Sequence, residues 1–295
     1  MLAIRSTVFS AARLAVSAAI FAVILSRISV RDVLARASAG LPVYLVGALS
    51  LLLLMIVLVA LRWRLLARWL GIAMSTGLAV RALFLAMFGG QLLPSAIGAD
   101  VLRGWLLARK TSGVARVVAS LMADRLMALF AACLLLLISD RAIARLVPSY
   151  AAFVAPAAVL GSGAILFAFL LGLRRMSAMR EVRVQAKPLL LALAIALVVQ
   201  GTAVVAAALV ATAYRLDGSL SLWVSVIPLS VMMSAIPVSV NGWGVREATI
   251  VTLASGLGIA PADALLVSVT LGVLHVLASL PGAVVMLRAP RPSPP

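Results

Sequence analysis

The chain has 295 residues, of which 65% are hydrophobic and 11% are charged. A water-soluble core does not need so much apolar sequence, so the composition predicts an all-α polytopic membrane protein without a separate soluble catalytic domain. The formal net charge is +17. It does not indicate nucleic-acid binding, because the arginines lie in short segments between apolar runs, where they set topology.

Several apolar segments are long enough to cross a bilayer, which takes roughly 20 residues. We expect the first, 8–26, to be a retained span rather than a cleaved signal peptide, because Arg13 interrupts it. The Pro-rich tail, 289–295, is expected to be disordered. The six predicted spans, about 20 residues each, are 8–26, 41–61, 115–138, 151–172, 189–213 and 263–287.

Two further apolar runs, 76–93 and 222–236, lead directly into short polar interruptions. The first interruption is LLPSAIGADVLRG, from Leu92 to Gly104, and the second is AIPVSVNGWGVRE, from Ala235 to Glu247. Interrupted apolar segments at matching places in two halves of a chain are typical of transport sites in membrane proteins.

The two interruptions share a spacing. Pro94 precedes Arg103 by nine residues, and Pro237 precedes Arg246 by the same nine. The two motifs stand 143 residues apart, so each occupies the same place in its own half of the chain. Apart from this proline and arginine, the halves share almost no residue identity at that offset.

Loop charges predict the topology. The basic segments 62–68 and 173–187 should be cytoplasmic, because cytoplasmic loops carry an excess of arginine and lysine. The piece 76–110 must then enter the membrane and return to the cytoplasm, and 222–258 must return to the outside. The basic first loop, 27–36, does not fit the outside position that this scheme gives it.

We therefore predict two inverted membrane repeats, 1–143 and 144–288, each with three spans and one re-entrant hairpin. Both termini are predicted to be cytoplasmic, in a bacterial cytoplasmic membrane. Inverted repeats of this kind place the substrate site at their interface, near the middle of the bilayer.

Six ionisable side chains are expected at membrane depth. Each would cost on the order of 2.5–3.5 kcal/mol at the bilayer centre if it faced lipid, so they must pair or line a polar cavity. An i,i+3 spacing allows Asp100 to pair with Arg103 on a helix. Arg246 and Glu247 are adjacent and should not face each other, so we expect partners from elsewhere. The six are Asp100, Arg103, Asp124, Arg125, Arg246 and Glu247.

The hairpins are predicted to bind a phospholipid head group. A second half-helix should start near Ser95 or Asn241, whose side chains suit an N-cap, and its free N–H groups would form an anion site. Arg103 and Arg246 add guanidinium groups suited to phosphate. Simple pairing of these arginines with Asp100 and Glu247 is the alternative. Trp243 is either an interface anchor or a head-group contact.

Two spans carry additional polar stripes. Arg116, Ser120 and Asp124 share one face of the predicted span 115–138, and Asp124 is either part of the site or a structural partner of a hairpin arginine. In the last span, His275 shares a face with Ser268, Gly272 and Ser279. A lone histidine there is more often a packed residue than a proton relay. With one cysteine, Cys133, and one histidine, no metal or other cofactor is expected.

The motifs resemble those of a known family. LLPSAIGADVLRG, then SLMADRL from Ser120 to Leu126, then NGWGVRE, are similar to the transmembrane region of the lysylphosphatidylglycerol synthase/flippase family over essentially the whole chain. The chain departs from the pattern at Ala99, where a second glycine is expected. The residues on motif positions are Asp100, Arg103, Asp124, Arg125, Asn241, Gly242, Gly244, Arg246 and Glu247.

The resemblance implies a lipid flippase. Larger family members carry a cytoplasmic aminoacyl-transferase domain, which this sequence lacks, so we expect no synthesis of aminoacyl-lipid by the chain itself. The expected partner is a phospholipid or an aminoacyl- or glycolipid head group. A membrane-embedded glycosyl- or aminoacyl-transferase, and an accessory subunit of a lipid-modifying enzyme, remain the alternatives. A homo-oligomer also stays open.

Overall fold

The computed structural model describes residues 41–92, 98–109, 113–139, 151–175, 185–216, 219–234 and 243–287, and the regular structure in these ranges is helical. The predicted span 8–26, the tail 289–295, Ser95 and Asn241 lie outside the described residues.

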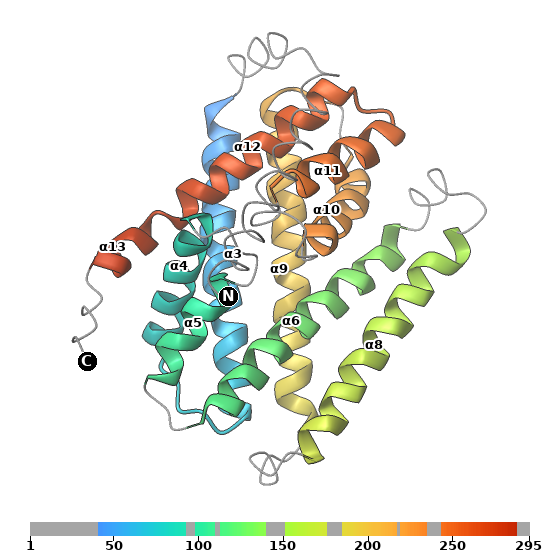
Figure 1. Cartoon of the computed structure of the whole chain (residues 1–295). Coiled ribbons are helices and arrows are strands. Elements are labelled where there is room, and N and C mark those ends of the chain that lie inside the picture. Colours follow the sequence, from blue (N-terminus) through green and yellow to red (C-terminus); the bar gives the residue numbers. More distant parts are fainter. Residues whose placement is uncertain are drawn as a thin grey trace, which may run out of the picture.

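Two long antiparallel helices, α3 (Pro42–Trp69) and α9 (Ala186–Ala213), run side by side through the centre of the molecule (Figure 1). Proline at the first turn of α3 fits a helix start, where its missing N–H has no intrahelical partner. The backbone N–H of Leu41 donates to the carbonyl of Ala213 over 2.9 Å, which joins the start of α3 to the end of α9.

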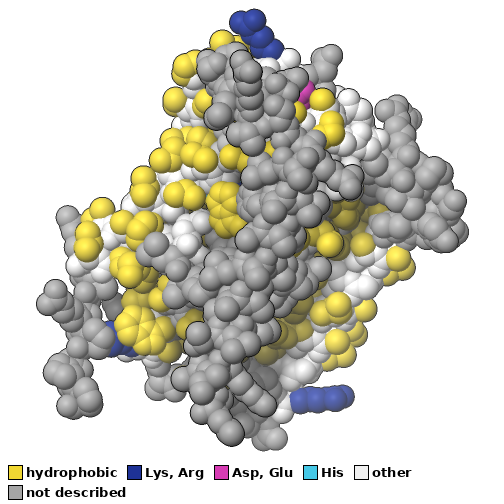
Figure 2. Space-filling model, turned by 45° about the horizontal axis from the view of Figure 1, so that its top comes forward, with side chains coloured by type: hydrophobic (Ala, Val, Ile, Leu, Met, Phe, Trp, Pro, Cys, Tyr) yellow, Lys and Arg dark blue, Asp and Glu magenta, His cyan; other side chains and the backbone are white. Residues whose placement is uncertain are grey.

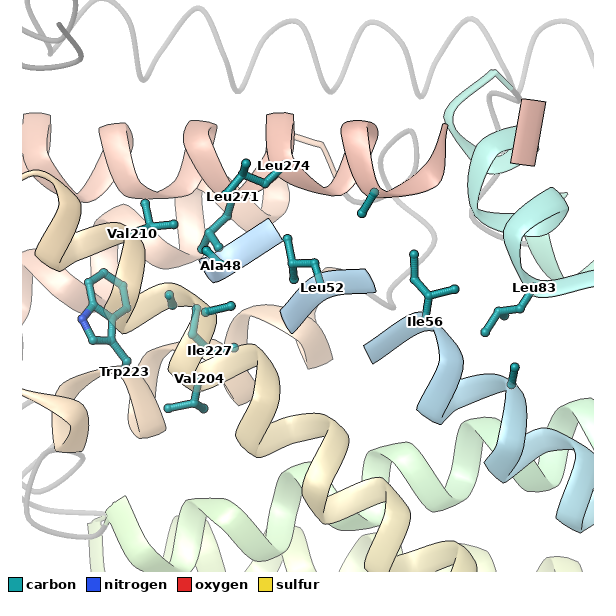
Figure 3. Packing of buried hydrophobic residues seen from close by; sticks show 14 of the residues in the cluster. Ala48, Leu52, Ile56, Leu83, Val204, Val210, Trp223, Ile227, Leu271 and Leu274 are labelled. Atoms are coloured by element: carbon teal, nitrogen blue, oxygen red, sulfur yellow. The ribbon is translucent and has the colours of Figure 1, made fainter. Parts of the chain in front are cut away.

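Small side chains let these two helices approach closely. Ala48 and Ala60 of α3 and Ala207 and Ala211 of α9 are all buried in one apolar cluster. Small residues are typical of helix contacts in membranes, where close van der Waals packing replaces the hydrophobic driving force. Figure 3 shows larger side chains of the same cluster, among them Leu52, Val210 and Trp223, from three different helices.

The other long helices surround this pair. Helix α6 (Val114–Leu136), extended by the 3-10 turn η1 (Leu137–Ser139), and α8 (Ala151–Arg175) slant together along one side in Figure 1. Helix α12 (Pro261–Ser279) crosses the bundle and contacts both α3 and α9. After a break at Leu280 the chain continues into α13 (Pro281–Leu287).

Each polar interruption begins at the end of one short helix and runs into the first turns of a second, and the two helices pack together. Helix α4 (Thr76–Leu92) precedes the first interruption, and α5 (Gly98–Ala108) begins within it; both lie beside α3 in Figure 1. Helix α10 (Leu220–Ser234) precedes the second interruption, and α11 (Val245–Gly256) begins within it; α10 packs on α9.

The described residues contain five helical segments that are long and apolar enough to cross a membrane: Pro42–Trp69, Val114–Ser139, Ala155–Leu173, Ala186–Ala213 and Pro261–Leu287. They confirm five of the predicted spans. Large hydrophobic side chains also cover much of the visible described surface (Figure 2), and Val43 and Leu160 are each 73% exposed. Such a surface suits contact with lipid.

The predicted end of the span 41–61 is wrong. The segment 62–68 is not a loop, because α3 continues through it to Trp69. Gly71 then turns the chain with φ 80°, in the left-handed region that glycine adopts without strain. Arg62 thereby becomes a buried residue inside a long helix, with 3% of its surface exposed.

The packing of α13 on α4 predicts an unequal effect of two glycine substitutions. A Cβ added at Gly282 would collide with the backbone carbonyl of Phe84, whereas one added at Gly172 in α8 meets nothing. Gly282→Ala should therefore destabilise the protein by about 1–3 kcal/mol, the usual effect of overpacking. Gly172→Ala should be neutral or stabilising by up to ~1 kcal/mol.

Thermal unfolding of the two variants in detergent measures this difference. Equal midpoints for Gly282→Ala and the parent protein would show that α13 does not pack on α4 as described.

Candidate functional site

Five charged side chains from three helices form one continuous chain of ion pairs. Asp124 of α6 accepts from Arg62 Nε of α3 at 2.7 Å and from Arg103 Nη1 of α5 at 3.0 Å. Asp100 of α5 then accepts from Arg103 Nε at 2.8 Å and from Arg125 Nε at 2.7 Å. Arginines and aspartates therefore alternate, and each aspartate joins two arginines.

This ion-pair chain runs from the interior to the surface. The side chains of Arg62, Asp124 and Arg103 are only 3–4% exposed. Asp100 is 19% exposed and Arg125 is 50% exposed. Asp100 lies in the first turn of α5, where the helix dipole favours a negative charge. The ion-pair chain contains three arginines and two aspartates, so it carries one surplus positive charge. Its exposed end is Arg125.

Trp63 supports the buried end of the chain. The Arg103 guanidinium carbon lies 4.9 Å from the centre of the Trp63 ring, within the range of a cation–π contact. Trp63 Nε1 donates to Ser120 Oγ at 3.1 Å, and Ser120 donates in turn to the Val117 carbonyl at 2.7 Å. Ser120, predicted as a lining residue, therefore orients Trp63.

The second interruption carries a smaller cluster around Glu247, which is fully buried. Arg246 Nε and Nη2 donate to Glu247 Oε1 at 3.0 and 2.5 Å, and the Gly244 N–H donates to Oε2 at 2.6 Å. The expectation that Arg246 and Glu247 cannot pair is wrong. Glu247 turns back over the start of α11, which brings its carboxylate within reach of its neighbour.

The start of α11 also corrects the predicted cap. The helix begins at Val245, and Gly244 occupies the N-cap with φ 87°. The N-cap is thus Gly244, three residues after the predicted Asn241. The first-turn carboxylate of Glu247 binds an N–H that was predicted to be free for an anion. Any other amino acid at position 244 would strain the backbone, because residues with a Cβ rarely adopt this φ.

A tryptophan of the second interruption contacts the end of α4. Arg246 lies over the ring of Trp243 at 4.9 Å, and Trp243 Nε1 faces Gln91 Oε1 across 3.4 Å. Gln91 is the last residue but one of α4 and directly precedes the first interruption. Gly272 of α12 makes room for this group, because a Cβ there would lie 2.6 Å from Arg246 Nη2 and 2.7 Å from Trp243.

The remaining predicted residues lie around these clusters. His275 Nδ1 faces the Leu271 carbonyl at 2.8 Å and must carry the proton, because a carbonyl only accepts. This bond favours the packed interpretation of His275 over a relay. Arg116 is half-buried near Gly71. It stands eight residues, about two helical turns, before Asp124 on α6.

The structure thus groups the predicted residues into two sets. Asp100, Arg103, Asp124 and Arg125 belong to the first cluster. Trp243, Arg246 and Glu247 belong to the second. Sequence reasoning missed three contributors: Arg62, Trp63 and Gln91. Gln91 was detectable as the one amide side chain in the apolar run 76–92.

All three carboxylates in the two clusters are engaged by guanidinium groups. Within the described ranges no three or more His, Cys, Asp or Glu side chains gather as metal ligands would. What the clusters offer is fixed charge and arginine donors inside a largely apolar bundle. Such groups suit the binding of a polar head group.

The long apolar helices and the charged clusters between them define a multi-pass α-helical membrane protein. More particularly, the chain belongs to the family described as the lysylphosphatidylglycerol synthase TM region, which matches residues 10–282. This match confirms the resemblance inferred from the motifs. Among curated proteins, none gives a significant match to the chain.

The ion-pair chain predicts a large effect of Asp124→Asn. The substitution leaves Arg62 without its acid and Arg103 with only Asp100, both in buried surroundings. Breaking a buried pair on one side typically costs about 3–5 kcal/mol, so the unfolding midpoint in detergent should fall sharply.

The double variant Arg62→Met/Asp124→Leu serves as the control. It removes one charge of each sign and leaves Arg103 with Asp100, so it should recover much of the lost stability. An Asp124→Asn protein as stable as the parent would contradict the assignment of this network.

Proposed function

We propose that this protein moves a lipid with a phosphate-bearing head group across a bacterial cytoplasmic membrane. The observation that carries the proposal is the contact between Trp243 and Gln91, because it joins the second cluster to α4, the helix that leads into the first interruption. An arginine from each half of the chain, Arg103 and Arg246, would hold the head group in turn, while the acyl tails stay in lipid.

The short helices support an interpretation as re-entrant hairpins. Helix α4 has 17 residues and α10 has 15. At 1.5 Å per residue, they reach about 25 and 22 Å, less than the roughly 30 Å of a bilayer's hydrocarbon core. Helices α5 and α11 are shorter still. Each pair would enter and leave by the same face, with its polar interruption at depth.

Helix boundaries support the proposed inverted repeat. Adding the motif offset of 143 to α3 gives 185–212, and α9 covers Ala186–Ala213. The same offset carries α4 to 219–235, where α10 covers Leu220–Ser234. The antiparallel contact of α3 with α9 is the relation that two inverted halves require. We propose cytoplasmic termini on the same topology.

The guanidinium groups give the path its selectivity. A phosphate crossing the hydrocarbon core without partners would meet the full cost of burying a charge. Arg103 and Arg246 are both oriented by a tryptophan ring and a carboxylate before any lipid arrives. Such preorganised donors would lower the barrier for an anionic head group more than for an uncharged one.

Transport in liposomes tests the proposal. The purified protein should move fluorescent phosphatidylglycerol between leaflets, measured by protection from external dithionite. Arg103→Gln and Arg246→Gln should each slow transport by roughly 10- to 100-fold, the equivalent of one lost charge-assisted hydrogen bond. Arg81→Gln is the matched control, because Arg81 is exposed on α4 of the same hairpin.

Two outcomes would overturn the proposal. One is a folded protein that moves neither phosphatidylglycerol nor an aminoacyl- or glycolipid. The other is product formation in an assay with an activated donor and lipid, abolished by Asp124→Asn, which would indicate a membrane-embedded transferase instead.

A further inference from the structure

The exposed end of the ion-pair chain lies on an apolar helix face. Val114, Val118 and Met122 follow one another at four-residue steps on α6 and are 52–66% exposed. Arg125 is three residues after Met122 and therefore lies on the same side of the helix. Its side chain is half exposed although it binds Asp100.

Helix α5 extends this surface. Val101 is 60% exposed and Trp105 is 42% exposed, one helical turn apart. Val101 is adjacent in sequence to Asp100, whose carboxylate meets Arg125 at 2.7 Å across the junction of the two helices. The α5–α6 face, made of Val101, Trp105, Val118, Met122 and Arg125, thus combines apolar side chains with the guanidinium of Arg125. A second guanidinium, that of Arg109, lies 3.9 Å from the centre of the Trp105 ring.

The charge of this face points to an anion. In the ion-pair chain, Asp100 and Asp124 are each shared by two arginines, and Arg125 is the arginine at its exposed end. The ion-pair chain as a whole has one positive charge in excess. A guanidinium surrounded by exposed apolar side chains of a membrane span is unfavourable unless another acceptor completes its hydrogen bonds. A negative group bound to Arg125 would extend the alternating series of arginines and aspartates and would balance its surplus positive charge.

We propose that an anionic phospholipid docks from the side on the α5–α6 face. Its phosphate accepts from Arg125, and an acyl chain lies along Val118 and Met122. Arg125 stands eleven residues beyond Val114, about 16 Å along α6, so the docked phosphate is held well below the membrane surface. The inference rests on the proposed lipid transport and identifies where the lipid enters the path.

Lipid cross-linking tests this docking site directly. The native Cys133 is buried and is replaced by alanine, and Met122→Cys then carries a benzophenone maleimide. The labelled protein is placed in bilayers of equimolar phosphatidylglycerol and phosphatidylcholine with identical acyl chains. Illumination and mass spectrometry give the ratio of the two lipid adducts.

A matched position reports the bulk lipid. Leu160→Cys lies on α8, is 73% exposed and has no charged residue within one helical turn. We expect phosphatidylglycerol adducts at position 122 to exceed those at position 160 by at least about fivefold, which is modest for a charge-assisted hydrogen bond. Arg125→Gln should abolish the enrichment, and Arg125→Lys should retain part of it.

The outcomes separate docking from transport. Equal adduct ratios at positions 122 and 160, enrichment that survives Arg125→Gln, or adducts with a second copy of the chain in place of lipid would each overturn the docking site. If docking fails while the parent protein still moves phosphatidylglycerol, the proposed function stands. If enrichment is found without transport, the docking site stands and the proposed function fails.

Discussion

Asp124 forms two buried ion pairs, one with Arg62 and one with Arg103, and these hold the first cluster together. It joins the long helices α3 and α6 to the short helix α5 through hydrogen bonds of 2.7 and 3.0 Å. The three side chains are only 3–4% exposed, so removing one of them leaves a buried charge without its partner. These bonds hold α5 against α3 and α6. Asp100 of α5 and Arg125 of α6 then form the more exposed end of the ion-pair chain.

The two interruptions reach a similar arrangement by different routes. Arg103 and Arg246 each follow a proline by nine residues, and each lies 4.9 Å from a tryptophan ring. Arg103 takes its tryptophan and one of its carboxylates from α3 and α6, whereas Arg246 uses Trp243 and Glu247 beside it in sequence. The first cluster is therefore tied to the long helices, and the second is largely self-contained.

Sequence patterns predicted the parts of this fold that depend on hydropathy. The span 189–213 corresponds closely to α9, and each polar interruption connects two short helices that pack together. Arg62 was misplaced because a charged residue after an apolar run resembles a loop. In the structure its charge is paired with Asp124, and the neighbouring Trp63 and Leu66 are fully buried, so the helix continues. The pairing of Arg246 with Glu247 depends on how α11 begins, which residue spacing does not reveal.

If the two interruptions form one lipid path, a cross-link between the end of α4 and Trp243 should block that path. In a Cys133→Ala protein, Gln91→Cys and Trp243→Cys can be joined by a short bifunctional thiol reagent, because their native side chains meet at 3.4 Å. We expect the double-cysteine variant to transport lipid more slowly than the parent, because Trp243 orients Arg246. Cross-linking should be efficient and should remove the remaining transport, which should return when a cleavable reagent is cleaved. Full cross-linking with unchanged transport, measured in the same liposomes, would contradict a single lipid path.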